Sequence, residues 1–267
     1  MSHFIAVLLG LVEGLTEYLP VSSTGHLVLV SYFLGSEGEG SKSFDIVIQL
    51  GAILAVVVHY RALLSERVRG LVRGKREAID LAVALAIGFL PAALVGLALR
   101  KTIKQHLFGP VPVAAALIVG GVVMIAVERL RASKKAEGVS GLEQVTPHRA
   151  LMIGLGQCFS LWPGASRSMC TIVAGQLSGL DTSTSAEFSF LLALPTLGAA
   201  TLYEFYKGRG ELFASVGASQ LVTGLVVSFL VAWLVIAGFI RYLRTRGLEV
   251  FAYYRILLAV VVLWALR

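Results

Sequence analysis

Residues 13–26 read EGLTEYLPVSSTGH, a polar run with a central proline inside a segment, residues 4–31, that is apolar at both ends. Hydrophobic residues make up 57% of the 267 positions and charged residues only 15%, so most of the surface is expected to face lipid. A chain that unwinds at membrane depth must satisfy its backbone polar groups against protein or a water-filled cavity. The segment is therefore predicted to form a re-entrant hairpin rather than to cross the membrane.

The same kind of interruption occurs once more, in residues 150–178, where residues 162–168 read WPGASRS. This segment is predicted to form a second re-entrant hairpin. A bilayer crossing takes roughly 20 apolar residues, and the remaining apolar stretches meet that length without leaving room for a soluble domain. The predicted fold is all-α: one integral membrane domain, residues 1–267, polytopic, with two re-entrant helical hairpins. Its six predicted transmembrane helices are residues 44–60, 79–99, 111–127, 188–206, 221–240 and 250–266.

The two broken segments also resemble each other. Setting Pro20 against Pro163 places Ser23 on Ser166, and further along residues 43–45, SFD, fall near residues 187–189, EFS. Self-similarity at this scale indicates one unit, a hairpin followed by three crossings, used twice.

The predicted repeats are roughly residues 1–128 and 148–267, joined by a cytoplasmic linker, residues 129–147. Because three crossings is an odd number, the second copy must enter the membrane from the opposite side. The sequence therefore predicts an inverted repeat whose two broken segments meet near the membrane midplane.

The formal net charge of +7 comes from basic clusters at the ends of apolar segments rather than along one face, which favours membrane orientation over nucleic-acid binding. Residues 61–76, 129–149 and 241–246 are rich in Lys and Arg and are predicted to be cytoplasmic by the positive-inside rule. Residues 37–39 and both termini are then expected outside. The basic run at residues 100–104 goes against this bias.

The first hairpin carries groups for acid–base and anion chemistry. Glu13 and Glu17 are four apart, so on a helix they share one face. The run SSTG at residues 22–25 precedes an apolar helix, and a helix start of this kind binds anions. His26 could serve as base, acid or nucleophile. The alternatives are a neutral structural glutamate, hydroxyls that only cap the helix, and a structural histidine.

The second hairpin adds a cation. Arg167 stands where the predicted helix breaks, and a guanidinium at membrane depth needs an anionic partner. It is predicted to clamp a phosphate bidentately, with a structural ion pair to Glu13 or Glu17 as the alternative. Arg255, in the last predicted crossing, is expected near the membrane edge with its side chain extended to the interface.

At these motifs the chain resembles the bacterial undecaprenyl-diphosphate phosphatases, also called bacitracin-resistance proteins. The matching residues are Glu13 and Glu17, residues 20–26 (PVSSTGH) and residues 163–168 (PGASRS), and the likeness spans the whole chain. The resemblance implies hydrolysis of undecaprenyl diphosphate, a C55 lipid, to the monophosphate and inorganic phosphate outside the cytoplasm. This reaction recycles the lipid carrier of cell-wall peptidoglycan synthesis in the bacterial inner membrane.

For this reaction either Ser23 is expected to attack with His26 as base, or His26 attacks directly, with Glu17 orienting or deprotonating the imidazole. Glu13 could hold Mg²⁺ or Ca²⁺ against the diphosphate, although no full metal site is visible and no organic cofactor is expected. A homodimer is a further expectation. The rival function is a carrier or flippase for a polyprenyl phosphate lipid. The predicted catalytic residues are Glu17, Ser23, His26 and Arg167, and the predicted substrate-binding residues are Glu13, Ser22, Thr24, Gly25, Gly164 and Ser166.

Overall fold

The computed structural model describes residues 1–33, 39–133 and 138–266. Within these ranges every regular element is helical, apart from an isolated parallel bridge between Val139 and Leu180, so the all-α prediction is confirmed. The elements are α1 (His3–Thr16), α2 (Ser23–Phe33), α3 (Glu39–His59), α4 (Arg61–Val72), α5 (Arg76–His106), α6 (Pro110–Ser133), η1 (Leu142–Gln144), α7 (Pro147–Cys158), η2 (Phe159–Leu161), α8 (Arg167–Leu177), α9 (Thr182–Ser215), α10 (Ala218–Leu243) and α11 (Glu249–Ala265).

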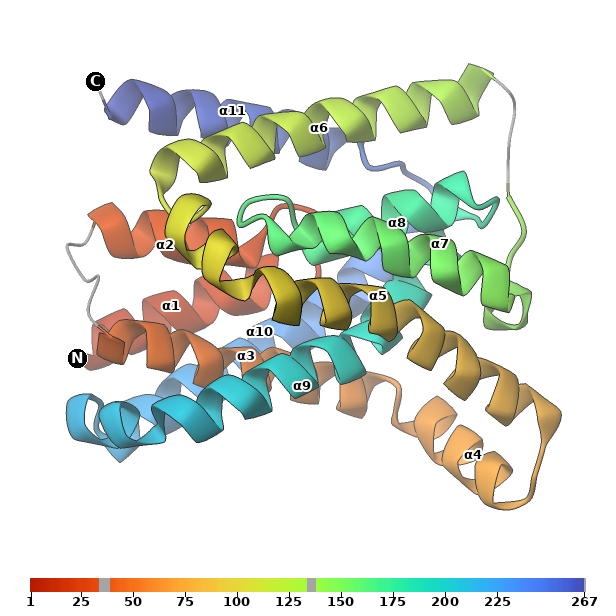
Figure 1. Cartoon of the computed structure of the whole chain (residues 1–267), viewed down its shortest axis with the longest axis horizontal. Coiled ribbons are helices and arrows are strands. Elements are labelled where there is room, and N and C mark those ends of the chain that lie inside the picture. The colour runs from red at the N-terminus through yellow and green to blue at the C-terminus, as the bar shows by residue number, and fades with distance from the viewer. Residues whose placement is uncertain (34–38, 134–137, 267) are drawn as a thin grey trace.

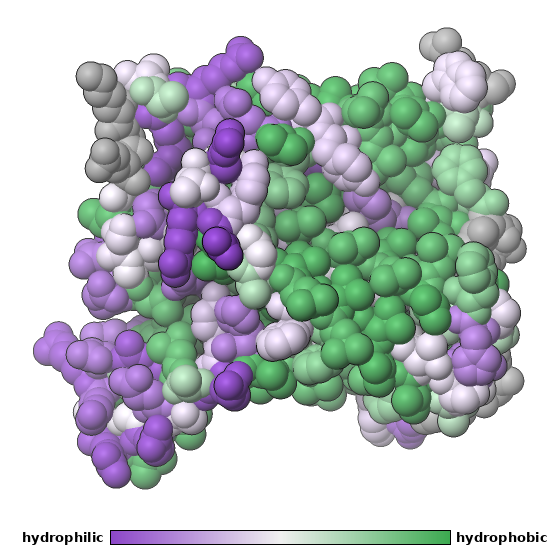
Figure 2. Space-filling model, turned by 180° about the vertical axis from the view of Figure 1, so that it is seen from behind, coloured by the Kyte–Doolittle hydropathy of each residue, from purple (hydrophilic) through white to green (hydrophobic). Residues whose placement is uncertain are grey.

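The described residues contain 4 helices long and apolar enough to cross a membrane, which lie in α5, α6, α9 and α10. A fifth span is possible by length and composition if α3 and α4, which meet at a bend of 74°, are taken together. The sixth predicted crossing corresponds to α11, which has 17 residues, the lower end of the roughly 17–25 that a crossing takes. The chain is therefore a multi-pass membrane protein. Figure 2 shows the matching surface, with hydrophobic residues gathered over the middle of one face.

The two polar interruptions break their helices where the sequence predicted. The first hairpin is α1 and α2, joined by a bend over residues 17–22, and the second is α7 and α8, joined by η2 and residues 162–166. Figure 1 shows that the hairpins point inward from opposite ends of the molecule, so that their bends lie in its centre. The start of α8 contacts the first bend, since Ser168 Oγ donates a hydrogen bond to the Leu19 carbonyl at 2.8 Å.

Each hairpin packs its first helix against a long helix from the other half of the chain, α1 against α10 and α7 against α5. Glycines allow this approach. A Cβ at Gly14 would lie 2.7 Å from the Ser228 carbonyl oxygen on α10, and a Cβ at Gly154 would lie 2.7 Å from the Gly88 oxygen on α5. Small residues of this kind let membrane helices pack backbone to backbone, which holds both hairpins firmly in place.

Parts of the predicted orientation fall outside the described residues. Glu37 of the acidic stretch and the basic residues Lys134 and Lys135 of the linker are among them. α6 continues to Ser133, into the first residues of the predicted linker.

Candidate active site

The bends of both hairpins end in a serine with the same unusual backbone conformation. Ser22 and Ser166 have positive φ values of 72° and 75°, which is unusual for residues other than glycine. Each hydroxyl then accepts a hydrogen bond from the amide three residues on: Gly25 N–H at 3.2 Å from Ser22 and Met169 N–H at 3.2 Å from Ser166. These serines therefore cap α2 and α8.

The caps fix how the two hairpins correspond. The structure matches Ser22 with Ser166 and Ser23 with Arg167, one residue away from the correspondence expected from the prolines. Ser22 thus makes the helix cap that was the alternative to a chemical role. The Gly25 amide, expected to hold phosphate, is occupied by this cap.

Three of the predicted catalytic side chains meet between the hairpins. Ser23 Oγ donates a short hydrogen bond to Glu17 Oε2, and Arg167 Nη2 lies 3.4 Å from Glu17 Oε1. All three are buried, with 5% exposure for Glu17, 6% for Ser23 and 9% for Arg167. Glu17 thus joins a hydroxyl to a guanidinium, one from each hairpin. The ion-pair alternative for Arg167 is present, with Glu17 as the partner.

Arg167 is held from behind by residues that the sequence analysis did not single out. Its Nη1 donates to the Ser189 carbonyl at 2.9 Å and to Ser189 Oγ at 3.2 Å, while Thr171 Oγ1 lies 2.7 Å from the same hydroxyl. The guanidinium carbon lies 5.9 Å from the centre of the Tyr18 ring. Arg167 Nε is buried with no hydrogen-bond partner in the described residues, so the guanidinium keeps a donor to offer.

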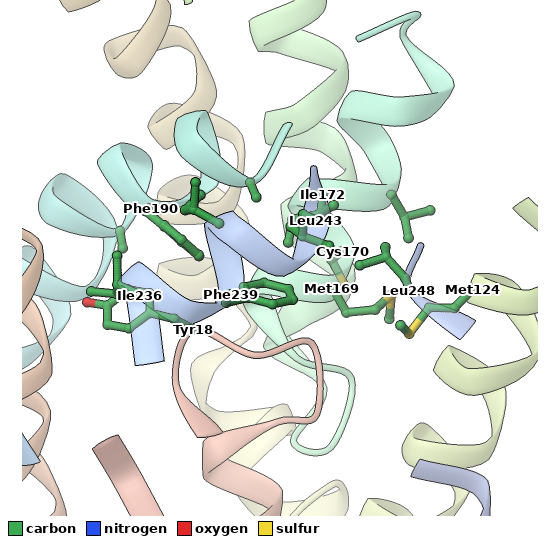
Figure 3. Packing of buried hydrophobic residues seen from close by; sticks show 14 of the residues in the cluster. Tyr18, Met124, Met169, Cys170, Ile172, Phe190, Ile236, Phe239, Leu243 and Leu248 are labelled. Carbon is green, nitrogen blue, oxygen red and sulfur yellow. The ribbon is translucent and has the colours of Figure 1, made fainter. Parts of the chain in front are cut away.

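Tyr18 ties this site to the core. Its hydroxyl donates to the Ala52 carbonyl at 2.8 Å, and its ring meets Phe190 edge to face with centroids 5.1 Å apart. Figure 3 shows Tyr18 in one cluster with Phe190 and Phe239. The residue next to Glu17 is therefore fixed by packing on α3, α9 and α10.

The carboxyl group of Glu13 lies beside that of Glu17. Glu13 is 1% exposed, and its Oε1 has no hydrogen-bond partner in the described residues. Its carboxyl interacts with those of Glu17 and Asp45. Asp45 Oδ1 is likewise buried without a partner. In the predicted repeat, residues 43–45 align with residues 187–189, which pairs Asp45 with Ser189. Asp45 lies near Glu13 of the first hairpin and Ser189 bonds Arg167 of the second, so this alignment was a signal by which both could have been found.

A cavity of about 590 Å³ opens onto the buried cluster. The predicted residues that line it are Glu17, Ser22, Ser23, Thr24, Gly164, Ser166 and Arg167. Its walls are mostly apolar, and include Phe89, Leu97, Leu161, Trp162 and Leu197. At another point on the lining, Arg100 forms an ion pair with Glu204 and lies over the Tyr203 ring, 4.9 Å from its centre. The cavity can therefore take a polar headgroup and part of an apolar chain.

His26 does not join the Glu17–Ser23–Arg167 cluster. Its Nδ1 lies 2.7 Å from the Ser22 carbonyl oxygen, and its Nε2 lies 2.8 Å from the Tyr254 hydroxyl. The ring stacks on Tyr254 with an interplanar angle of 3°. His26 lines a separate apolar hollow between α2 and α11, together with Leu29 and Leu258. With both nitrogens engaged there, the group in contact with the Ser23 hydroxyl is Glu17.

The prediction for Arg255 is wrong. The residue is 0% exposed and lies among the bends of both hairpins rather than at the membrane edge. Counting residues from the helix end placed it near the interface, but its surroundings are made by segments distant in sequence.

Comparison with known proteins agrees with the motifs. The family model for the bacitracin resistance protein BacA matches residues 6–261. The chain is 62% identical over 265 residues to an undecaprenyl-diphosphatase of Sorangium cellulosum, covering 99% of this chain and 86% of that protein. It is 46% identical over 258 residues to the undecaprenyl-diphosphatase of Nitrosomonas europaea, covering 97% and 92%. It is 48% identical over 259 residues to undecaprenyl-diphosphatase 2 of Rhodospirillum rubrum, covering 97% and 93%. The resemblance stated from the motifs is thus confirmed, and this chain belongs to the bacitracin resistance protein BacA family.

Proposed function

We propose that this chain hydrolyses undecaprenyl diphosphate to undecaprenyl phosphate and inorganic phosphate, and so recycles the lipid carrier of cell-wall synthesis. One observation carries the proposal: the Ser23 hydroxyl donates to Glu17, and Glu17 pairs with Arg167, all three buried on a cavity with apolar walls. A hydroxyl held by a carboxylate beside a guanidinium has the parts for phosphoryl transfer. The relatives named undecaprenyl-diphosphatase give the substrate its identity.

In the proposed mechanism Ser23 Oγ attacks the terminal phosphorus of the diphosphate and Glu17 accepts the hydroxyl proton. The bond from that phosphorus to the bridging oxygen breaks, and undecaprenyl phosphate leaves with the bridging oxygen. Glu17 gives the serine proton to the departing undecaprenyl phosphate. Water then attacks the phosphoserine, Glu17 accepts a water proton and passes it to Ser23 Oγ as the bond from Oγ to phosphorus breaks, and inorganic phosphate leaves. Arg167 holds the phosphate oxygens and neutralises charge that spreads over them during transfer. Direct attack by His26 remains the alternative, but its ring nitrogens contact Ser22 and Tyr254.

The cofactor proposal is a divalent cation, Mg²⁺ or Ca²⁺, bound together with the substrate. The described residues contain no group of three His, Cys, Asp or Glu side chains that could hold a metal ion. Phosphate oxygens would therefore supply most of the ligands, as hard cations prefer. The unpartnered Glu13 Oε1 supports a protein ligand at that carboxylate. Loss of phosphate release in EDTA, restored by either ion, is the expected result.

The finer architecture belongs to the same proposal: six transmembrane helices and two re-entrant hairpins in an inverted repeat, in the bacterial inner membrane, with the site facing the periplasmic or extracellular side. α1 packs on α10, and α7 packs on α5, so each hairpin contacts the equivalent helix of the other half of the chain. This reciprocal packing supports the repeat. The ion pair with Glu204 gives Arg100 a local partner, so the basic run there need not mark the cytoplasmic side. The homodimer stays a prediction.

The test is phosphate release by the purified, detergent-solubilised chain given farnesyl or undecaprenyl diphosphate with Mg²⁺ or Ca²⁺. Radiolabel from the terminal phosphate is then trapped on the protein. An acid-stable label lost in Ser23→Ala supports attack by Ser23, whereas an acid-labile label lost in His26→Ala supports attack by His26. A chain that binds the lipid but releases no phosphate refutes hydrolysis and leaves the carrier in its place, since a carrier needs Arg167 but no nucleophile.

A further inference from the structure

Arg255 on α11 is the largest fully buried side chain described, with 0% exposure. In the described part of the chain no carboxylate forms an ion pair with it, and every acceptor of its hydrogen bonds is a backbone carbonyl. A buried guanidinium is costly unless its donors are satisfied, and here all three nitrogens are bonded. The acceptors are Pro20 at 2.9 Å, Gly164 at 2.9 Å, Ala165 at 3.0 Å, Ala116 at 3.2 Å and Leu117 at 3.4 Å.

These acceptors lie in three segments, and Arg255 bonds to all of them. Pro20 is in the bend of the first hairpin, three residues before Ser23. Gly164 and Ala165 are in the bend of the second, directly before Ser166 and Arg167. The remaining two carbonyls belong to α6. The Arg255 side chain thus holds the backbone just before Ser23, the proposed nucleophile, and just before Arg167, the proposed phosphate-binding group.

The surroundings are shaped for a guanidinium. A Cβ at Gly120 on α6 would lie 2.1 Å from Arg255 Nη2, so only glycine leaves room for the group. The first turn of α2 lies against the second bend, since a Cβ at Gly25 would lie 3.3 Å from Gly164 Cα. Carbonyls freed by an unwound bend need donors within the protein, and the planar fork of arginine supplies them in fixed directions. Lysine has three donors on one atom and cannot reach all three segments at once.

We propose that Arg255 is a positioning residue for phosphoryl transfer: it binds the carbonyls of both hairpin bends and so sets Ser23 and Arg167 in register across the site. This rests on the proposed function. Because Arg255 touches the bends rather than the cavity, its loss should misplace the two reacting groups without removing either. Misplacement by about 1 Å lowers turnover on the order of 100-fold.

The experiment compares Arg255→Lys with Arg149→Lys. Arg149 is a matched control, because its guanidinium also bonds carbonyls, those of Gln144 at 2.7 Å and Ser178 at 3.2 Å, but at the outer end of the second hairpin. Phosphate release and thermal unfolding are measured for both in detergent. We expect Arg255→Lys to lower kcat on the order of 100-fold with KM changed less than about threefold, and Arg149→Lys to keep kcat within about twofold.

Gly120→Ala keeps the test decisive if Arg255→Lys fails to fold, since it displaces the guanidinium while leaving it present. The same fall in kcat is expected. An unchanged kcat in folded Gly120→Ala or Arg255→Lys, or a rise in KM alone, overturns the positioning role. A lower unfolding temperature with unchanged kcat overturns it as well, because a purely structural role predicts that pattern. Failure of the wild-type chain to release phosphate refutes the proposed function instead.

Discussion

The first and second hairpins share a backbone and differ in chemistry. Each breaks a helix, turns through a serine with positive φ, and starts a new helix capped by that serine. The residue after the cap is Ser23 in the first hairpin and Arg167 in the second. At equivalent positions one hairpin presents a hydroxyl, the proposed nucleophile, and the other a cation, and Glu17 of the first hairpin bonds to both.

This difference assigns separate tasks to the two halves. The first hairpin holds the carboxylates Glu13 and Glu17, so the proposed mechanism confines proton transfer to it. The second hairpin holds the guanidinium, braced by Ser189, so the proposed mechanism confines charge neutralisation there. Two helix N-termini then face the same cavity, and both favour an anion through the helix dipole. The arrangement explains how a diphosphate can be held at membrane depth without a large polar pocket.

The largest effect is expected from replacing the proposed nucleophile with alanine, compared with the same change at the capping serine of the other hairpin. Ser23→Ala removes the nucleophile and should lower kcat on the order of 10⁴-fold or more. Ser166→Ala, a serine of the other hairpin, loses a helix cap of about 1 kcal/mol and should lower kcat by about tenfold at most. Phosphate release under saturating lipid measures both. Equal losses of kcat in the two variants would show that the two hairpins do not differ in their part in catalysis.

Next in size is the proposed base. Glu17→Gln keeps a hydrogen-bond acceptor for Ser23 but cannot take its proton, so kcat should fall on the order of 10³-fold. The variant also removes the ion-pair partner of Arg167, which should leave that guanidinium no less able to bind phosphate. KM for the lipid is therefore expected to stay level or fall. A kcat close to wild type would show that another group accepts the proton.

A smaller loss is expected at the cation. Arg167→Lys retains the charge but loses the fork that bonds Ser189 and Glu17 together, so kcat should fall on the order of 100-fold. Arg149→Lys serves again as control. If Arg167→Lys raises KM while kcat is unchanged, the guanidinium binds the ground state only and plays no special part in transfer.

Local features of the site were predictable from sequence, whereas contacts across the chain were not. The breaks at the two polar runs, the helix starts and the buried ionic residues follow from rules that act within a few residues. The partner of His26 is Tyr254, 228 positions away, and nothing in the sequence near His26 indicates it. Arg255 was misplaced for the same reason, since its acceptors belong to other segments. The register between the hairpins was off by one residue because the capping serine comes two residues after Pro20 but three residues after Pro163, and an alignment on prolines ignores this difference.

The smallest effect concerns the shared turn itself. Ser22 and Ser166 each carry a backbone conformation that costs about 1–3 kcal/mol for a residue with a Cβ, and each offsets part of this by capping a helix. Glycine relieves the strain and caps only a few tenths of a kcal/mol less well than serine, although it adds about 0.5–1 kcal/mol of unfolded-state entropy. Ser22→Gly and Ser166→Gly should therefore leave the free energy of unfolding nearly unchanged or raise it by up to about 2 kcal/mol, whereas alanine keeps the strain, loses the cap, and should cost about 1 kcal/mol at either position. Thermal unfolding in detergent of the four variants measures this, and the glycine variants should unfold above the alanine variants in both hairpins. If glycine is as damaging as alanine in one hairpin only, the serine hydroxyl there does more than cap, and the two turns are equivalent in shape but not in role.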